Sequence, residues 1–157
     1  MKGTYLCILH LATALRQLPV GKLGKFDCAP GYYLYIGKAF GPGGVPARLR
    51  HHQKPTRTRP HWHLDYLVPH TRLTEVWTVS PLNLETAWCE ALAAIPDLSI
   101  PIRGFGASDS PCTAHLFYSP VAPPCRWLSQ SLLSCLPLDS PNGRNVHIAI
   151  HLCQKTP

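Results

Sequence analysis

Four side chains in the first third of the chain are of the types that bind phosphate and act on it. Arg48 and His52 stand four residues apart, so they share one face of a helix. An arginine guanidinium matches a phosphate with two parallel hydrogen bonds, and a histidine donates to a phosphate oxygen or relays a proton. Tyr5 and Tyr35 each lie in a strand-like apolar run. The set predicts a phosphate site, with a solvated basic helix and two half-buried sheet tyrosines as the alternative.

The segments that must position these side chains alternate between strand-like and helix-like patterns. Apolar or β-branched runs predict strands, and apolar residues at helical spacing predict helices. The expected strands cover 4–11, 31–37, 61–68, 74–80 and the end of 103–118, and the expected helices cover about 45–53 and 83–95. Glycines and prolines in 17–30 predict a loop or short hairpin. This order predicts an α/β (α+β) fold with a mixed β-sheet flanked by helices.

The length of 157 residues indicates one domain, followed here by a tail. Beyond residue 118, prolines become frequent among serines and leucines. We therefore expect a domain over residues 1–118 and an appendage of uncertain order over residues 119–157, in which 145–152 still has a strand pattern.

Positive charge is concentrated in the half of the chain that contains the phosphate-binding candidates. Residues 1–72 contain eleven Lys/Arg and two Asp/Glu, a net charge of +9, whereas the remainder contains four and six, a net charge of −2. This asymmetry predicts an acidic partner, most commonly nucleic acid. The cations expected to contact its backbone are Lys38, Arg50, Lys54, Arg57, Arg59 and Arg72. Backbone contacts carry little sequence information, so we expect recognition of structure or damage rather than of a long sequence.

Two further groups contain residue types that ligate metals. His61, His63 and Asp65 fall on one face of the strand expected there. By residue type they form a transition-metal triad, although polar residues facing a groove give the same pattern. Cys112 and His115 have spacing compatible with zinc ligands, but two ligands do not complete a zinc site. All five are candidates for accessory metal or substrate contacts.

The cysteines and the N-terminal run bear on the compartment. The chain has seven cysteines and no CxxC pair, and Cys7 and Cys89 lie in apolar runs. This usage predicts reduced, buried thiols in a cytoplasmic protein. The N-terminal apolar run is interrupted by His10 and Thr13 and closed by Arg16, so we interpret it as a buried strand rather than a membrane-spanning helix.

Five ordered segments resemble one nuclease superfamily. GTY at 3–5 is similar to the GIY element, YIG at 35–37 is the YIG element unchanged, and RLRHH at 48–52 is similar to the Arg-then-His helix of the GIY-YIG nucleases. The closer resemblance is to the small Uri-type stand-alone branch, catalogued as domain of unknown function 123. Its motifs match residues 3–8, 31–52, 61–67 and 104–118, with Ser110 in place of the first cysteine of the branch's Cys-x-Cys.

The resemblance implies a metal-dependent endonuclease that hydrolyses DNA phosphodiester bonds. It implies that Tyr5, helped by Tyr35, orients or deprotonates the attacking water, and that Arg48 and His52 contact the phosphate. The carboxylate expected on a later helix is assigned to Glu90 because "EALAA" fits the family's small-residue helix, with Glu85 as the alternative. This carboxylate would hold Mg²⁺ or Mn²⁺.

The resemblance also implies a DNA-repair context, because domains of this branch can be joined to endonuclease III-type glycosylases. Two other functions remain open from the residues alone. One is a nucleic-acid-binding module without catalysis, and the other is a domain whose Cys/His set binds a metal for structure.

Overall fold

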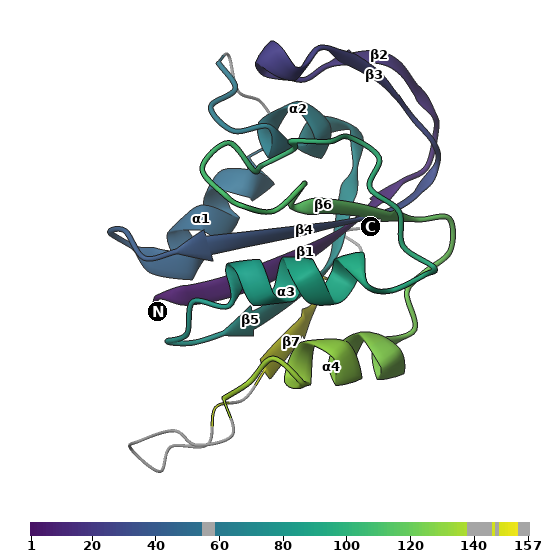
Figure 1. The fold of residues 1–157 in the computed structure, drawn as a ribbon. Coiled ribbons are helices and arrows are strands. Elements are labelled where there is room, and N and C mark those ends of the chain that lie inside the picture. Colours follow the sequence, from purple (N-terminus) through teal and green to yellow (C-terminus); the bar gives the residue numbers. More distant parts are fainter. Residues whose placement is uncertain (55–58, 138–145, 147, 154–157) are drawn as a thin grey trace.

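The computed structural model describes residues 1–54, 59–137, 146 and 148–153 (Figure 1). The strands are β1 (Gly3–Leu11), β2 (Leu15–Pro19), β3 (Lys25–Cys28), β4 (Gly31–Ala39), β5 (Arg72–Val79), β6 (Leu116–Ser119) and β7 (Ile148–Leu152). The α-helices are α1 (Gly44–Gln53), α2 (Leu64–Leu67), α3 (Glu85–Ala93) and α4 (Cys125–Leu133), and single 3₁₀ turns cover Gly21–Leu23 and Val68–His70.

Five strands form one sheet in the order β6-β4-β1-β5-β7, and every pairing in it is antiparallel. β1 is central because its continuous apolar run can be buried on both faces. The expected α+β class is confirmed. We expected a mixed sheet from the sequence, and that expectation is wrong. All neighbouring strands of the described five-stranded sheet run in opposite directions.

Each face of the sheet packs against its own pair of helices. Tyr5, Cys7 and Tyr35 face the side covered by α1 and α2, with Phe105 beside them. The alternate side chains, represented by Leu6 of β1, face α3 and α4. The alternation predicted for 31–37 is confirmed, because Tyr33 and Tyr35 lie in one core and Leu34 and Ile36 in the other.

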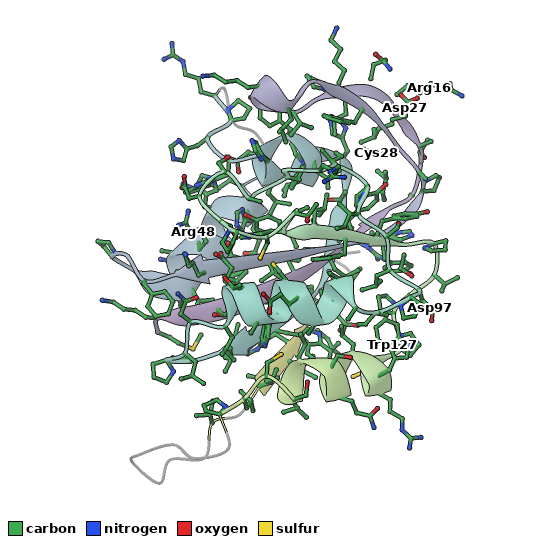
Figure 2. The ribbon with its side chains drawn as sticks, in the orientation of Figure 1. Arg16, Asp27, Cys28, Arg48, Asp97 and Trp127 are labelled. Atoms are coloured by element: carbon green, nitrogen blue, oxygen red, sulfur yellow. The ribbon has the colours of Figure 1, made fainter. Side chains whose placement is uncertain are left out.

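The segment 17–30 forms part of a two-stranded hairpin, β2–β3, that extends from the main sheet (Figure 1). Arg16, Asp27 and Cys28 mark this hairpin in Figure 2. The backbone N–H of Gln17 donates to the Asp27 carboxylate at 2.9 Å. Gln17 adopts a positive φ of 52°, and this bond holds it there. The hairpin alternative to a plain loop is therefore the observed structure.

The expected strand over 61–68 is wrong, since these residues form the short helix α2 and the turn that precedes it. The Asp65 carboxylate accepts the backbone N–H groups of His61 at 2.8 Å and of Trp62 at 3.0 Å. These bonds fix the turn that leads into α2, because they tie the backbone of His61 and Trp62 to a side chain inside the helix. Leu64 and Leu67 are both buried, and their spacing of three residues is typical of one helix face. The alternation of polar and apolar residues over 61–68 fits a strand equally well, so the pattern alone does not distinguish the two.

The core continues past residue 118, where we expected the domain to end. α4 packs against α3, and its Leu128 and Leu132 are fully buried in the same core as α3. β7 extends the sheet by pairing with β5, with Val79 opposite Ile148. The described part of 119–157 is thus integrated with the domain because its apolar residues complete the far face of the sheet (Figure 1).

The edge of the sheet at β4 is only partly covered. β6 pairs with residues 32–35 of β4, and the last contact across this edge is the bond from the Ile36 N–H to the His115 carbonyl. Gly37 and Lys38 follow beyond the end of β6. At this place side chains from both sides of the sheet can reach a common space.

Candidate functional site

A pocket of about 360 Å³ lies at this open edge of β4. Its lining comes from β1, β4, α1, the start of α2, the start of α3 and the loop before β6. The side chains with chemical potential are Tyr5, Tyr35, Lys38, Arg48, His52, His61, Trp62, His63, Glu85, Asp109, Ser110 and His115. The four residues that opened the sequence analysis therefore converge, as does the predicted cation Lys38.

Tyr5 and His52 form the centre of the pocket. The Tyr5 hydroxyl and the His52 Nε2 are 3.0 Å apart, and both side chains are buried. Tyr35 lies beside them, with its ring centroid 6.5 Å from that of Tyr5 and 6.1 Å from that of His52. The Tyr5 ring lies against Gly37, where an added Cβ would come within 2.4 Å of the Tyr5 Cζ. Glycine at this position therefore makes room for the tyrosine.

Arg48 is held by an aromatic surface. Its Cζ lies 4.0 Å from the centroid of the Trp62 ring, which is a cation–π arrangement. Figure 2 shows Arg48 next to α1, well away from Trp127 and Asp97 near the helices of the other sheet face. Stacking restricts the guanidinium while leaving its N–H groups available to a phosphate. Arg48 is thus preorganised to bind an anion.

Trp62 is held in turn by the pair of His51 and Asp65. The His51 Nε2 lies 2.9 and 3.1 Å from the two oxygens of the Asp65 carboxylate, and the His51 ring contacts the Trp62 ring at a centroid distance of 4.3 Å. Burial would raise the pKa of Asp65, but its hydrogen bonds from Trp62, His61 and His51 outweigh burial and lower it. Asp65 is therefore an ionised anchor for the turn that positions Trp62.

His63 has a defined tautomer. The backbone N–H of Gly106 donates to the His63 Nδ1 at 2.8 Å, so the proton of the neutral ring is on Nε2. Burial lowers the pKa of His63, which favours this neutral form. His63 therefore offers a neutral N–H donor in the pocket wall, from the turn before α2 rather than from the strand we expected there.

Glu85 supplies a buried carboxylate to the pocket, which Asp109 also lines. It opens α3 and is buried, with one oxygen 3.2 Å from the Lys38 Nζ and the other 3.7 Å from the His115 Nδ1. The His115 Nε2 contacts the Ser110 hydroxyl at 2.8 Å. Burial is the largest influence on the pKa of His115 and lowers it. The half-exposed Lys38 side chain is the part of this network most easily displaced by a metal ion.

Glu90, the carboxylate we assigned to the metal, lies elsewhere. It is exposed and lines a separate hollow of about 180 Å³ together with Cys89 and Cys112. Five residues separate Glu85 from Glu90, which places them on different parts of the α3 surface. The predicted convergence of Glu90 with the tyrosines and Arg48 is therefore wrong, and the alternative carboxylate Glu85 occupies that place.

The surroundings keep both pocket tyrosines protonated. Burial is the largest influence on the pKa of Tyr5 and raises it well above the ordinary value, and burial raises that of Tyr35 likewise. The negative charge of Glu85 raises both pKa values further. Arg48 lowers both, by more than Glu85 raises the pKa of Tyr5 and by less than Glu85 raises that of Tyr35, and burial outweighs it in each case. Without an added cation, neither hydroxyl acts as a tyrosinate base at neutral pH.

The remaining predicted cations do not all lie at the pocket. Lys54 and Arg72 line a neighbouring hollow of about 300 Å³, which shares His52 with the main pocket. Arg50 and Arg59 are exposed and line neither cavity, and Arg57 lies outside the described residues. Of the described cations predicted to contact nucleic acid, only Lys38 lines the main pocket.

Sequence reasoning missed the places of Trp62 and Gly106 in the pocket, and it preferred Glu90 to Glu85. The signal for Glu85 was present, because Trp88, Cys89 and Leu92 follow it at the third, fourth and seventh positions and form the buried face of α3. A carboxylate on the buried face of a helix is unusual unless it has a partner. No sequence signal indicated that Gly106 would fix a histidine tautomer.

Comparison with family models adds one match. The model described as domain of unknown function DUF123 matches residues 4–135. The chain belongs to this family. The matched range contains every element that lines the pocket and extends through α4, beyond the boundary expected at residue 118. Nothing among the curated proteins or the solved structures matches the chain.

The helices that the structure describes are short, and the longest of them, α1, has 10 residues. In residues 1–54, 59–137, 146 and 148–153, none is both long enough and apolar enough to span a bilayer.

Proposed function

We propose that the protein is a GIY-YIG-type endonuclease that hydrolyses DNA phosphodiester bonds with the help of Mg²⁺ or Mn²⁺. The observation that carries the proposal is the convergence of Tyr5, Tyr35, Arg48, His52 and Glu85 in one pocket. These residues come from β1, β4, α1 and α3, so the fold, and not proximity in the sequence, brings them together. The order and identity of the motifs that contain the first four support the same superfamily.

In this proposal Arg48 binds the scissile phosphate. Its stacked guanidinium presents a planar set of donors that matches two phosphate oxygens. Lys38 and the neutral His63 add positive charge and a hydrogen-bond donor to the same pocket. Together these groups stabilise the negative charge that grows on the phosphoryl oxygens during attack.

Tyr5 and His52 form the proposed proton relay. Hydrolysis forms a bond from the water oxygen to phosphorus, breaks the bond from phosphorus to the leaving sugar oxygen, and moves one proton from water to that oxygen. Since the raised pKa of Tyr5 excludes a standing tyrosinate, its hydroxyl passes its proton to His52 as it accepts one from water. The proton then returns to the leaving group through solvent.

Glu85 is the residue we assign to the metal ion in place of Glu90. A hard carboxylate oxygen suits Mg²⁺ or Mn²⁺, and one carboxylate is enough when water and phosphate oxygens complete the shell. A divalent cation held there supplies charge stabilisation at the phosphate. Because the charge of Glu85 raises the pKa of both tyrosines, neutralising it also makes proton transfer from Tyr5 easier.

The net charge of +9 in residues 1–72 supports nucleic acid as the substrate, and contacts by surface cations favour recognition of its structure or damage. A role in DNA repair, alone or next to an endonuclease III-type glycosylase, fits such recognition.

A specific observation favours a second function, binding without cleavage. Lys38 already neutralises Glu85, and both tyrosines are protonated.

A cleavage survey separates the two functions. The purified chain is incubated with branched, flapped, nicked and intact DNA duplexes and an RNA hairpin, with Mg²⁺, Mn²⁺ or a chelator. We expect metal-dependent cleavage of at least one structured DNA, and binding whose affinity falls as salt rises. Salt-sensitive binding to these substrates with no cleavage under any condition would contradict the nuclease and support the binding module. Binding that does not change with salt would remove nucleic acid as the partner.

A further inference from the structure

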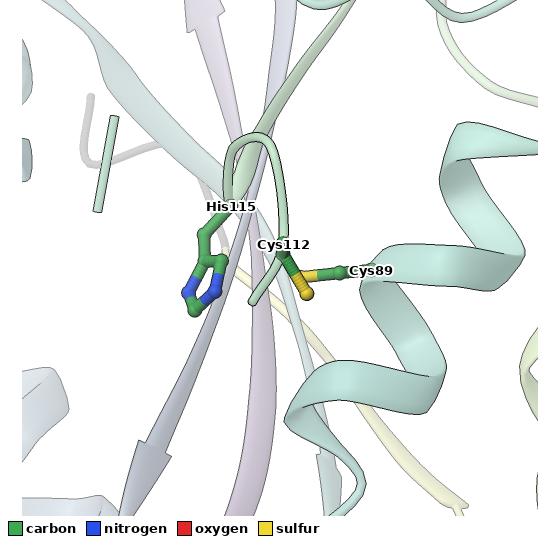
Figure 3. A group of neighbouring side chains, drawn as sticks. All are labelled: Cys89, Cys112 and His115. Atoms are coloured by element: carbon green, nitrogen blue, oxygen red, sulfur yellow. The ribbon is translucent and has the colours of Figure 1, made fainter. Parts of the chain in front are cut away.

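A second group of metal-ligating side chains lies behind the pocket, where α3 meets the loop before β6. Cys89, Cys112 and His115 each offer one ligand atom, and these atoms all lie within 4.8 Å of one another (Figure 3). Cys89 comes from the middle of α3, and the other two from the loop and the residue that precedes β6. The three ligands therefore join two elements that are distant in the sequence.

The burial of this cluster suits a metal site more than a surface group of thiols. Cys89 and His115 are both only 2% exposed, and Cys112 is partly buried. Burial raises the pKa of the Cys89 thiol, and the adjacent Cys112 raises it further. Cys89 and Cys112 thus lie close together, and a divalent cation bound between them would take the place of their thiol protons.

We propose that Cys89, Cys112 and His115 bind Zn²⁺. Two thiolates and one imidazole are a preferred zinc donor set, and their separations of at most 4.8 Å let the three ligand atoms close around one ion. Binding replaces the two thiol protons by the metal, so two protons are released for each Zn²⁺ bound. The fourth position is left to solvent or to the Ser110 hydroxyl, which lies 2.8 Å from the His115 Nε2.

His115 has the outer partner that a zinc-bound histidine requires. Its Nδ1 lies 3.7 Å from a Glu85 oxygen, so we assign Nε2 to the metal and leave the Nδ1 proton to the carboxylate. A carboxylate in this position orients the ring and raises its basicity as a ligand. The hollow lined by Cys89 and Cys112 supplies the path for entry. The site would fix Glu85 and the loop of Ser110 from behind, whether or not the pocket cleaves DNA.

Cobalt provides a direct test, since tetrahedral Co²⁺ bound to thiolates has a charge-transfer band that Mg²⁺ or oxygen-donor sites do not produce. We expect the reduced full-length protein to show this band with one equivalent of Co²⁺, and Zn²⁺ to remove it by displacing Co²⁺. Cys89→Ser and Cys112→Ser should each weaken binding by more than about 100-fold, because loss of even an outer partner costs about 10–100-fold.

Matched cysteines serve as controls. Cys28 is buried like Cys89, and Cys135 is partly buried like Cys112, yet neither belongs to the cluster. Cys28→Ser and Cys135→Ser should keep the band at full strength. Absence of the band in the unmodified reduced protein would overturn the proposal, as would a band that survives in both cluster variants. Since these readouts do not involve DNA, failure here is distinct from failure of the nuclease.

Discussion

The two walls of the pocket have opposite chemistry. The α1–α2 wall carries Arg48, His52 and Trp62, which are cationic or aromatic, whereas the α3 wall carries the carboxylate Glu85. A phosphate is attracted to the first wall and repelled by the second. The second wall can attract a phosphate only when a cation is bound at Glu85. In the proposed function the α1–α2 wall is the substrate wall and the α3 wall is the metal wall.

The metal wall gives the largest expected effect. Glu85→Gln should lower the cleavage rate by about 1,000-fold or more, which is about 4 kcal/mol of barrier. It should leave metal-free DNA affinity unchanged or slightly higher, because a negative charge is lost. Single-turnover cleavage and binding measured in parallel check both parts. Glu90→Gln is the matched control on the same helix and should keep full activity. The reverse pattern would exchange the roles of the two glutamates.

The substrate wall should respond in a different way. Arg48→Ala should lower both cleavage and DNA affinity, because Arg48 would contact the phosphate before and during the reaction. We expect about a 100-fold loss in kcat/KM, or about 2.7 kcal/mol, measured on the best substrate of the survey. Arg50 lies on the same helix but outside the pocket, so Arg50→Ala should change affinity slightly and leave the cleavage rate unchanged. Equal losses in both variants would mean that the wall supplies only general charge.

The anchor of the substrate wall should show its effect in stability. Asp65→Asn should destabilise the fold by about 1–3 kcal/mol at neutral pH, since the bonds to His51 and to two backbone N–H groups are weakened. Because the pKa of Asp65 is lowered by folding, its contribution is present above the ordinary value of about 3.9 and is lost as pH falls through the folded value. The denaturant midpoints of the variant and the unmodified protein should therefore differ at neutral pH and converge at acidic pH. A difference in midpoint that stays constant with pH would contradict an ionised Asp65 carboxylate in the folded state.

The smallest expected effect is on tyrosine ionisation. Tyr5 and Tyr35 should ionise above the ordinary pKa of about 10, and the transition assigned to Tyr5 should vanish in Tyr5→Phe. As pH rises past about 10 the unfolded chain ionises first, so the folded state loses stability. An absorbance titration of tyrosinate measures this. If Mn²⁺ binds at Glu85, it should lower the pH at which both tyrosines ionise. No change in the two ionisation midpoints with Mn²⁺ would argue against binding at that position.

Much of the fold followed from the sequence because apolar patterning reports burial directly. β1, β4, α1 and α3 were expected close to their observed bounds, and these elements carry the tyrosines, Arg48 and Glu85. The segment 61–68 was assigned wrongly because its alternation fits a strand, whereas hydrogen bonds to the Asp65 side chain decide for a helix. Such bonds between a side chain and the nearby backbone compete with strand formation, and hydrophobic periodicity does not measure them.

The sequence predicted those features of the site that a single helix or strand determines. It did not predict contacts that depend on how several elements pack together. The spacing of Arg48 and His52 gave their shared face, and the helix pattern of α3 contained the signal for Glu85. The stacking of Arg48 on Trp62 depends on how α1 meets α2, which no local pattern encodes. The spacing of Cys112 and His115 made both of them zinc candidates, but their meeting with Cys89 of α3 depends on tertiary packing that no local pattern encodes.

The central claim is that a divalent ion stands on the α3 wall, facing the phosphate-binding wall. The most direct measurement is the broadening of backbone amide signals of the full-length protein by small amounts of Mn²⁺, which prefers oxygen ligands to thiolates. We predict broadening centred on Glu85 and its contacts Lys38 and His115, retained in Glu90→Gln and Cys112→Ser and lost in Glu85→Gln. Broadening centred on Glu90, or unchanged in Glu85→Gln, would contradict the account.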